Sequence, residues 1–434
     1  MRLPSSLALL RLLPLLLLSF AAAAAPACKG SKTDTLPTAD GGEDDPDAAV
    51  AIPCGAGNVS KGPWVLAVDG TSAKIRWEAC VAGTAARVTV TPETGGAAST
   101  VDAVETATVV TEQTISILAP KYPDPAGTFY MHEASLTGLA QGTCYAYVLA
   151  ADASYKGRFC TARASGDALR FMAIGDTNPT INDNTKKILA NVLPKNPDFV
   201  LHGGDIQYYA SGIETWSGWF RIMQPMLAKA GFFPAIGNHE SEKPSEYEQY
   251  TLRFFHDAGF DGSPAYYRFE SGGVWFFSID TEDSVAPGTP QGTWLVSSLA
   301  DASQKPGYRF SVVYFHKPFV TCGDTYDDPT ALAYYAPIFK TYKVPLVLQA
   351  HMHGYERFAF DGITYVTTGG GGGIIEKPSL NTSRSYCDKR VAAGPWYHAM
   401  IIDIAAATAG STISGQAIDK DGVVRDTFQL TPPP

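Results

Sequence analysis

The sequence predicts a protein with both β-only and α/β regions, in which a β-sandwich precedes a larger α/β sandwich. The chain of 434 residues exceeds the size at which one hydrophobic core keeps growing, so two domains are expected. Residues 64–161 have the pattern of strands alone, whereas strand and helix patterns alternate after Ser165. Apolar residues make up 45% of the chain, which is ordinary for a folded, water-soluble protein.

Residues 1–27 have the pattern of an export signal. Arg2 and Arg11 flank a leucine-rich stretch, and small residues precede Cys28. The residues before Cys28 also resemble a bacterial lipoprotein cleavage box, although Pro26 departs from it. We therefore expect a secreted or cell-envelope protein, and both lipid attachment at Cys28 and plain secretion stay open.

Residues 28–53 are predicted to form a disordered acidic linker. They are rich in Gly, Asp, Thr and Pro, a composition that cannot offset the entropy of folding. Calcium binding by Asp44, Asp45 and Asp47 is the alternative, but their spacing does not match a calcium loop.

Seven cysteines fit an oxidising compartment, because six remain for disulfides if Cys28 carries a lipid. Spacing alone does not determine the connectivity. We expect Cys144 to pair with Cys160 across one hairpin, and Cys322 to pair with Cys387 inside the second domain. Cys54 and Cys80 remain for the third pair.

The first domain is expected over residues 54–165 as a β-sandwich of about seven strands. Residues 132–139 and 142–147 resemble the closing strands of a fibronectin type III domain. The clearest strand patterns cover residues 64–68, 74–78, 87–91 and 145–148.

The second domain is expected over residues 166–434, with its active site beyond the carboxyl ends of its strands. The predicted strands cover residues 169–174, 198–201, 274–279, 310–315, 346–349 and 363–367, the predicted helices cover 182–193 and 214–229, and a hairpin turn covers 419–422.

Five short blocks of oxygen and imidazole ligands each follow an apolar, strand-like segment. Ligands gathered from several strand ends suit a two-metal hydrolytic centre, because one loop cannot wrap two cations and leave positions open. The blocks are Gly175-Asp176, residues 204–208 (GDIQY), 237–240 (GNHE), 313–316 (VYFH) and 350–353 (AHMH).

These blocks, in this order, resemble the calcineurin-like metallophosphoesterases and in detail the purple acid phosphatases. Residues 351–357 (HMHGYER) and the hairpin residues 266–276 are also similar to that family. The resemblance implies hydrolysis of phosphate monoesters, with a metal-bound hydroxide as the nucleophile.

The resemblance also implies which residues hold the two metal ions. Asp205 would bridge both ions, since a carboxylate has two oxygens. The first ion would be held by Asp176, Asp205, Tyr208 and His353, and the second by Asp205, Asn238, His316 and His351.

Tyr208 indicates iron at the first site. A phenol with an ordinary pKa of about 10 binds as phenolate only beside a strongly acidic cation such as Fe(III). Most relatives carry a His where this chain has Asn178, so one ligand replaces the other. The second ion is expected to be Fe(II), Zn or Mn. A surface role for Tyr208 is the alternative.

His239 is the expected catalytic residue, which would contact substrate phosphate and assist departure of the leaving group. A structural role is the alternative.

The chain departs from the family after His316, where plant enzymes carry further histidines. Lys317, Asp324 or Tyr326 could take their place, or face solvent. Ala350 also replaces a usual glycine, and residues 369–373 (GGGGG) are interpreted as a permissive turn near the site. Glu356 and Arg357 are expected to pair and to orient residues 351–353.

The formal charge of −10 makes nucleic acid an improbable structural partner. Two other functions stay open beside the monoesterase. One is a phosphodiesterase on the same scaffold. The other is a non-enzymatic surface binding protein with a vestigial metal site.

Overall fold

The computed structural model describes residues 54–110, 127–179, 182–208, 213–241, 252–255, 261–323, 327–377, 384 and 386–433. The predicted signal segment and acidic linker lie outside these residues. The described residues belong to one compact unit, Ala48–Pro434. Within them, no helix combines the length and apolar character needed to cross a membrane.

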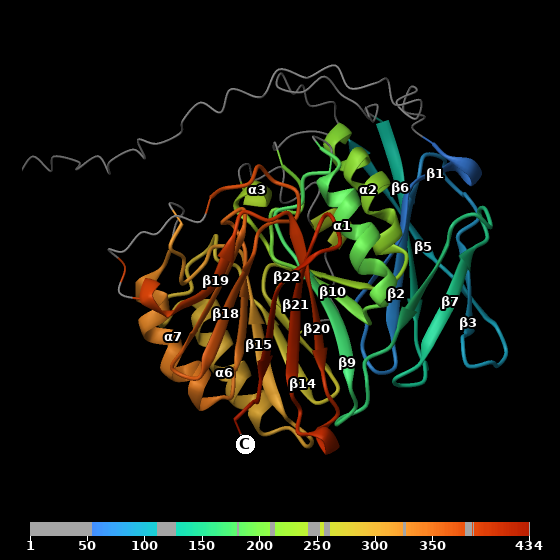
Figure 1. The fold of residues 1–434 in the computed structure, drawn as a ribbon. Helices are drawn as coiled ribbons and strands as arrows, with labels where there is room; N and C mark the ends of the chain where they lie inside the picture. Colours follow the sequence, from blue (N-terminus) through green and yellow to red (C-terminus); the bar gives the residue numbers. More distant parts are fainter. Residues whose placement is uncertain are drawn as a thin grey trace, which may run out of the picture. The chain divides into compact units, whose positions relative to one another are not determined.

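Three sheets organise this unit (Figure 1). The largest sheet has the spatial order β22 (Val424–Leu430), β21 (Ile413–Asp419), β20 (His398–Ile404), β9 (Leu169–Ile174), β10 (Phe199–His202), β11 (Gly231–Pro234), β1 (Val59–Leu66), β2 (Ala73–Ala79), β6 (Gly127–Leu136) and β5 (Val104–Val110).

The second sheet faces the first across the central core. Its order is β12 (Asp261–Gly262), β13 (Tyr267–Ser271), β14 (Val274–Ser278), β15 (Phe310–Tyr314), β16 (Leu346–Gln349), β18 (Ile363–Thr368), β17 (Tyr355–Phe360) and β19 (Arg390–Gly394). The third sheet has the order β4 (Ser99–Asp102), β3 (Arg87–Pro92), β7 (Cys144–Leu149) and β8 (Lys156–Cys160).

Helices cover the outer faces of the two larger sheets, α1 and α2 on one side and α6 and α7 on the other (Figure 1). The α-helices are α1 (Asn184–Val192), α2 (Ile213–Leu227), α3 (Asn238–Ser241), α5 (Leu252–Phe255), α6 (Pro290–Ser303) and α7 (Pro329–Thr341). The 3-10 helices are η2 (Ala56–Asn58), η3 (Leu193–Lys195), η5 (Cys387–Lys389) and η6 (Ala407–Ala409). The predicted α/β sandwich is thereby confirmed.

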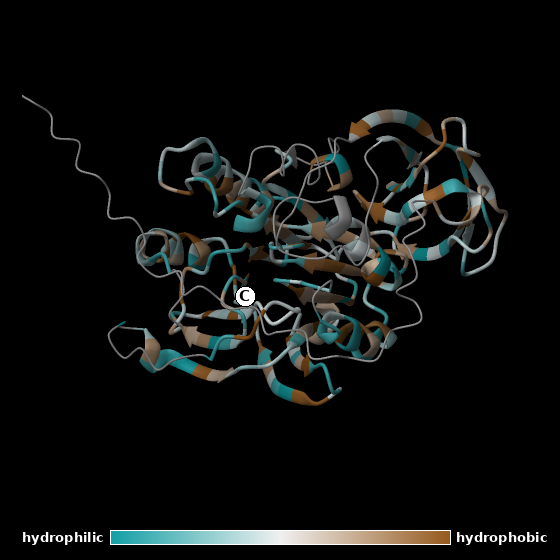
Figure 2. Ribbon diagram, turned by 90° about the horizontal axis from the view of Figure 1, so that it is seen from above, coloured by the Kyte–Doolittle hydropathy of each residue, from teal (hydrophilic) through white to brown (hydrophobic). Residues whose placement is uncertain are grey.

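Alternate residues of a strand are buried on opposite faces of its sheet, which explains how the layers pack together. In β9, Phe171 and Ala173 join the core between the two large sheets, whereas Met172 and Ile174 join the core beneath α1 and α2. Both faces of the central strands are therefore apolar. Figure 2 shows this as brown strand segments in the middle of the fold.

The N-terminal sandwich is joined to the larger sheet. Strands β1, β2, β6 and β5 oppose the third sheet, and β1 also pairs in parallel with β11 through Val65 and Gly231. A hydrogen-bonded sheet thus runs across the region where the sequence predicts separate domains. The boundary at residue 165 and the fibronectin-like assignment stay predictions.

All three expected disulfides are present: Cys54–Cys80, Cys144–Cys160 and Cys322–Cys387. Such bonds fit an oxidising compartment.

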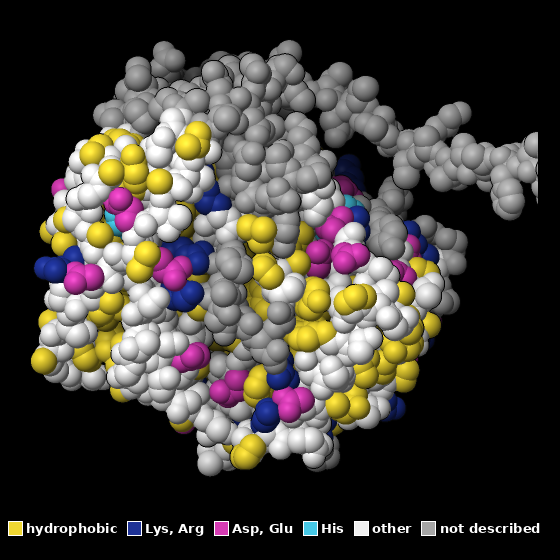
Figure 3. Space-filling model, turned by 180° about the vertical axis from the view of Figure 1, so that it is seen from behind, with side chains coloured by type: hydrophobic (Ala, Val, Ile, Leu, Met, Phe, Trp, Pro, Cys, Tyr) yellow, Lys and Arg dark blue, Asp and Glu magenta, His cyan; other side chains and the backbone are white. Residues whose placement is uncertain are grey.

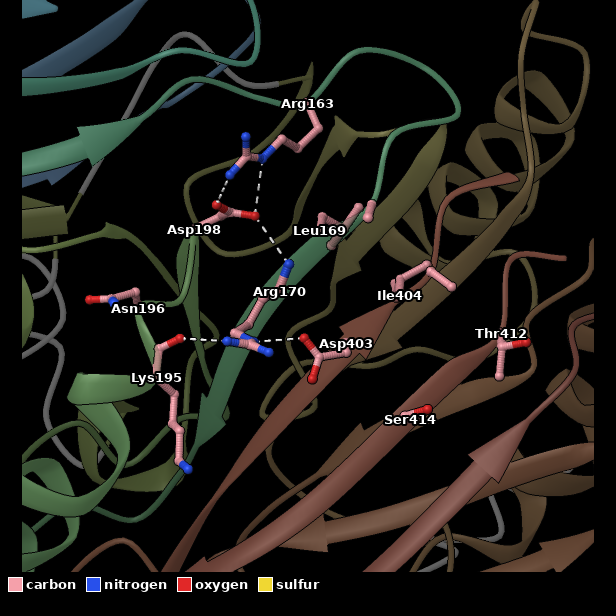
Figure 4. A pocket seen from close by; sticks show the side chains of 12 residues that line it. Arg163, Leu169, Arg170, Lys195, Asn196, Asp198, Asp403, Ile404, Thr412 and Ser414 are labelled. Atoms are coloured by element: carbon pink, nitrogen blue, oxygen red, sulfur yellow. Dashed lines mark hydrogen bonds and ion pairs between the residues drawn. The ribbon is translucent and has the colours of Figure 1, made fainter. Parts of the chain in front are cut away.

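An ion-pair network joins the sandwich to the first residues of β9, the residue before β10 and the last residues of β20 (Figure 4). Arg163, just after the sandwich, pairs with Asp198 through two nitrogens. The backbone N of Arg170 donates to the same carboxylate over 3.1 Å, and its guanidinium Nε lies 2.6 Å from Asp403 Oδ1. The network surrounds a pocket of about 430 Å³.

Acidic and basic groups are also interspersed on the outer surface. On the face in Figure 3, dark blue Lys and Arg side chains lie beside magenta Asp and Glu side chains.

His398 at the start of β20 is fully buried. Its Nδ1 lies 2.9 Å from the carbonyl O of Trp396, which identifies Nδ1 as the protonated nitrogen. Burial lowers the pKa of His398 to about 4, although Trp396 and Asp419 oppose the shift.

We predict that His398 makes stability depend on pH. Because its folded pKa lies below the ordinary value, the unfolded chain binds the proton more readily, and stability is lost as pH falls from about 6.5 to about 4. In His398→Asn, the side-chain amide can still donate to Trp396 but does not titrate. Urea unfolding across this range should show a shallower slope for His398→Asn than for the parent. Parallel slopes would contradict the assignment.

Candidate metal centre

The predicted ligand blocks meet at one edge of the molecule. Strands β9, β10 and β11 are parallel in one sheet, and β15 and β16 are parallel in the other. Their carboxyl ends lie together, so the loops after them converge. The side chains brought together there are Asp176, Asp205, Tyr208, Asn238, His239, His316, His351 and His353.

One group forms around Asp176. Ligand atoms of Asp176, Asp205 and His353 all lie within 4.8 Å of one another. The hydroxyl of Tyr208 lies 3.0 Å from Asp176 Oδ1 and 2.7 Å from His353 Nε2. Tyr208 is buried, so the alternative of a surface aromatic is wrong.

A second group shares Asp205. Ligand atoms of Asp205, His316 and His351 also lie within 4.8 Å of one another. The Nε2 of His316 lies 3.3 Å from Asp205 Oδ2 and 3.0 Å from both Asn238 Oδ1 and His351 Nδ1. Asp205 is therefore the carboxylate common to both groups.

Backbone carbonyls fix the orientation of two imidazoles. His316 Nδ1 lies 3.0 Å from the O of Gly203, and His353 Nδ1 lies 2.8 Å from the O of Ile374. A carbonyl oxygen accepts hydrogen bonds only, so each Nδ1 carries a proton and a neutral ring turns its Nε2 lone pair inward. These lone pairs face carboxylate, amide and phenol oxygens. Such a set of acceptors facing one another fits bound cations.

The pKa values of these groups reflect how closely their side chains lie together. Burial works to raise the pKa of Asp205, but His316 and His239 hold it far below its usual range. Burial works to lower the pKa of His316, but Asp205 raises it to about 10. Burial and the nearby charge of His316 lower the pKa of His351 to about 3. These shifts fit a site that holds positive charge between the carboxylates.

The surroundings of Tyr208 shift its pKa so that the neutral phenol is favoured. Burial, then Asp176 and Asp205, raise the pKa of its phenol well above 10. The neutral phenol of Tyr208 donates its proton to Asp176 Oδ1.

The backbone at the centre is strained. Asp176, Asp205 and His351 have φ angles of 58°, 48° and 68°, values that residues with a side chain rarely adopt. Gly237 allows Asp205 to approach, since a Cβ there would lie 2.2 Å from Asp205 N. Such strain is common at functional sites, where the surrounding structure maintains it.

His239 lies at the accessible side of the centre. Its side chain is 21% exposed, and its Nε2 is 3.8 Å from Asp205 Oδ2. Its ring packs against Tyr208, with ring centroids 4.3 Å apart. The position allows contact with a bound substrate.

Glu240 supports the centre, although no sequence pattern pointed to this role. It is fully buried, and its carboxylate accepts backbone N–H bonds from Asp205, Ile206 and Gly237 at 2.8–2.9 Å. Burial and Asp205 raise its pKa to about 8. Its place directly after Asn238 and His239 was the available signal, but the contacts span 34 to 35 residues along the chain.

The glycine run of residues 369–373 and Ala350 both lie close to the candidate ligands. The glycine run lies at the centre as expected, with Gly371 N bonded to Gly175 O and Gly373 N bonded to Asp176 O. The methyl group of Ala350 is accommodated because Gly175 and Gly203, which flank it, have no side chains.

The expected pairing of Glu356 with Arg357 is wrong. Adjacent strand residues point to opposite faces of a sheet. Glu356 instead pairs with Arg390, and Arg357 pairs with Asp426.

Lys317 is paired with Glu282, with Nζ 2.6 Å from Oε2. Asp324 and Tyr326 lie outside the described residues.

We predict that Glu240→Gln weakens the centre without removing any candidate ligand. An amide has one acceptor oxygen, so at least one backbone N–H loses its partner, at a cost of about 1–3 kcal/mol. Urea unfolding should show this loss, and elemental analysis should show less retained metal. Glu93→Gln, which changes an exposed ion pair with Arg158, is the control. Equal metal retention in both variants would contradict the role of Glu240.

Comparison with known proteins agrees with this geometry. Residues 169–355 match the model of the calcineurin-like phosphoesterase family. Purple acid phosphatase 13 of Arabidopsis thaliana is 26% identical over 321 residues, which cover 58% of each chain. A phosphoenolpyruvate phosphatase of Allium cepa is 27% identical over 261 residues, covering 56% of this chain and 53% of that protein. The chain spans about half the length of the curated relatives it matches.

Solved structures show the same fold. A purple acid phosphatase from yellow lupin seeds aligns with a TM-score of 0.69 at 17% identity, over 85% of this chain and 74% of that one. PhoD aligns with a TM-score of 0.59 at 12% identity, over 85% and 88%. The chain therefore contains a calcineurin-like phosphoesterase domain and is homologous to the purple acid phosphatases.

Proposed function

We propose that this protein hydrolyses phosphate monoesters at a binuclear metal centre. The observation that carries the proposal is the position of Asp205, a buried carboxylate common to two groups of possible ligands. Homology to purple acid phosphatases supports the phosphate ester as substrate class.

The proposed ligands of the two ions correspond to the two groups of side chains that share Asp205. The inward lone pairs of His316 and His353, with the oxygens they face, support this assignment. Asp176, Asp205, Tyr208 and His353 would hold the first ion, and Asp205, Asn238, His316 and His351 the second.

We propose Fe(III) at the first site, and Fe(II), Zn or Mn at the second. The raised pKa of Tyr208 supports a strongly acidic first ion, because a weaker one would leave this buried phenol protonated. Phenolate-to-iron charge transfer would then give the protein a visible colour.

The bound ions would supply Lewis acidity that activates water and neutralises charge on the phosphoryl group. The chain's own residues do the rest of the chemistry. Glu240 fixes the loops that carry Asp205 and Asn238. His239 would contact the phosphoryl oxygens and protonate the leaving oxygen, which favours mildly acidic pH because an imidazole is then charged.

We infer that the protein is exported through residues 1–27, with or without a lipid on Cys28. Three disulfides support an oxidising destination.

The proposal predicts a preference for monoesters. A monoester dianion gains more than a diester monoanion from a positively charged site, so kcat/KM for p-nitrophenyl phosphate should exceed that for bis-p-nitrophenyl phosphate by at least about tenfold. The reverse order would favour the phosphodiesterase.

The matched variant for this experiment is His316→Ala. Loss of a ligand should lower kcat/KM by more than about a hundredfold, since even residues that only support a ligand cost 10–100-fold. A folded His316→Ala protein with the parent's activity would point to a vestigial centre.

The iron assignment predicts that Tyr208→Phe loses visible colour. Without the phenol oxygen there is no phenolate-to-metal charge transfer, while the ring still packs against His239. The visible spectrum and metal content of the purified protein are the measurements. Tyr147→Phe, which removes a buried hydroxyl elsewhere, should keep the parent spectrum. A colourless but active parent would exclude the ferric phenolate.

A further inference from the structure

A second pocket, of about 370 Å³, lies at the same edge of the fold as the candidate centre. The loop after β14 and the N-terminal part of α7 form its walls. We call it the Glu282 pocket, and its lining includes Glu282, Asp283, Lys317, Phe319, Asp328 and Tyr334.

The Glu282 pocket adjoins the candidate centre. Lys317, one of its lining residues, directly follows His316, so their Cα atoms are about 3.8 Å apart. The backbone N of Lys317 donates to Thr281 Oγ1 over 2.8 Å, which joins the two loops beside His316. The Glu282 pocket therefore lies beside the loop that carries His316.

The pocket has a negative balance of charge. Its described lining contains three carboxylates, those of Glu282, Asp283 and Asp328, against the single ammonium of Lys317. The Asp328 carboxylate caps α7 by accepting from the backbone N of Thr330 and Ala331. Such a lining attracts a cation more than an anion.

Among the lining residues, Glu282 gives the most specific evidence for a bound ligand. Its side chain is only 9% exposed, and Lys317 occupies Oε2. Its other oxygen, Oε1, is buried and has no hydrogen-bond partner among the described residues. A buried carboxylate oxygen without a donor is costly, so a ligand that supplies an N–H would stabilise it.

The remaining lining favours an organic cation. The half-buried ring of Tyr334 contributes aromatic surface, which attracts ammonium groups. A metal ion is a poorer fit, because among the described residues the only carboxylate and imidazole groups close enough to hold one are at the centre itself.

We propose that the Glu282 pocket binds the alcohol part of the substrate, and that this part carries a primary ammonium group. The preferred substrates are then phosphate monoesters of amino alcohols. The inference rests on the proposed phosphatase function and adds a substrate class to it.

The test compares kcat/KM for three alkyl monoesters: O-phosphoethanolamine, phosphocholine and n-propyl phosphate. The first offers charge and N–H donors, the second charge alone, and the third neither. The expected order is O-phosphoethanolamine, then phosphocholine, then n-propyl phosphate. The first should exceed the last by about tenfold or more, as for a charge-assisted hydrogen bond.

In Glu282→Gln, the ratio of kcat/KM for O-phosphoethanolamine to kcat/KM for n-propyl phosphate should fall close to one. Gln can still accept from Lys317, but its NH₂ group would face the ammonium as a second donor. Glu270→Gln is the matched control, since Glu270 is a partly buried carboxylate on β13 that contacts Gly273. It should leave the ratio as in the parent.

Equal kcat/KM for the three esters, or a preference that persists in Glu282→Gln, would overturn the ammonium pocket and leave the phosphatase function standing. If neither these esters nor p-nitrophenyl phosphate is hydrolysed, the proposed function fails and the inference fails with it.

Discussion

The arrangement of the site depends on Asp205, a carboxylate held in the left-handed backbone region between two groups of possible ligands. Its position requires support from several sides. Gly237 lacks a side chain where one would overlap Asp205, Glu240 accepts the Asp205 backbone N–H, and His239 N donates to Asp205 Oδ1 over 2.9 Å. Each support comes from the loop after β11, so the two loops are ordered together.

The two large sheets hold this arrangement in place. Asp176 and Asp205 extend from one sheet, and His316, His351 and His353 from the other, so the site exists only when the core between the sheets is packed. Aromatic pairs such as Phe199 with Phe276, whose centroids lie 5.1 Å apart, join the sheets in that core. A rigid support of this kind suits ligands that must keep their positions when metal binds.

Local sequence patterns predicted much of the fold and of the candidate site. Ligand blocks directly follow apolar strands, so their convergence could be inferred from the parallel α/β pattern alone. The contacts of Glu240 and Glu282 were beyond such reasoning, because their partners lie about 35 positions away along the chain. The pairing expected between Glu356 and Arg357 failed for a related reason, since adjacency in a strand separates side chains. Long-range partners are set by tertiary packing, which one sequence does not display.

The most direct test of a shared carboxylate is the metal content of Asp205→Asn beside the parent, measured by elemental analysis after equilibrium dialysis. The account predicts two metal ions per chain in the parent and loss of both in the variant, because an amide cannot bridge two cations as a carboxylate does. A variant that keeps one tightly bound ion, or a parent that binds only one, would contradict it.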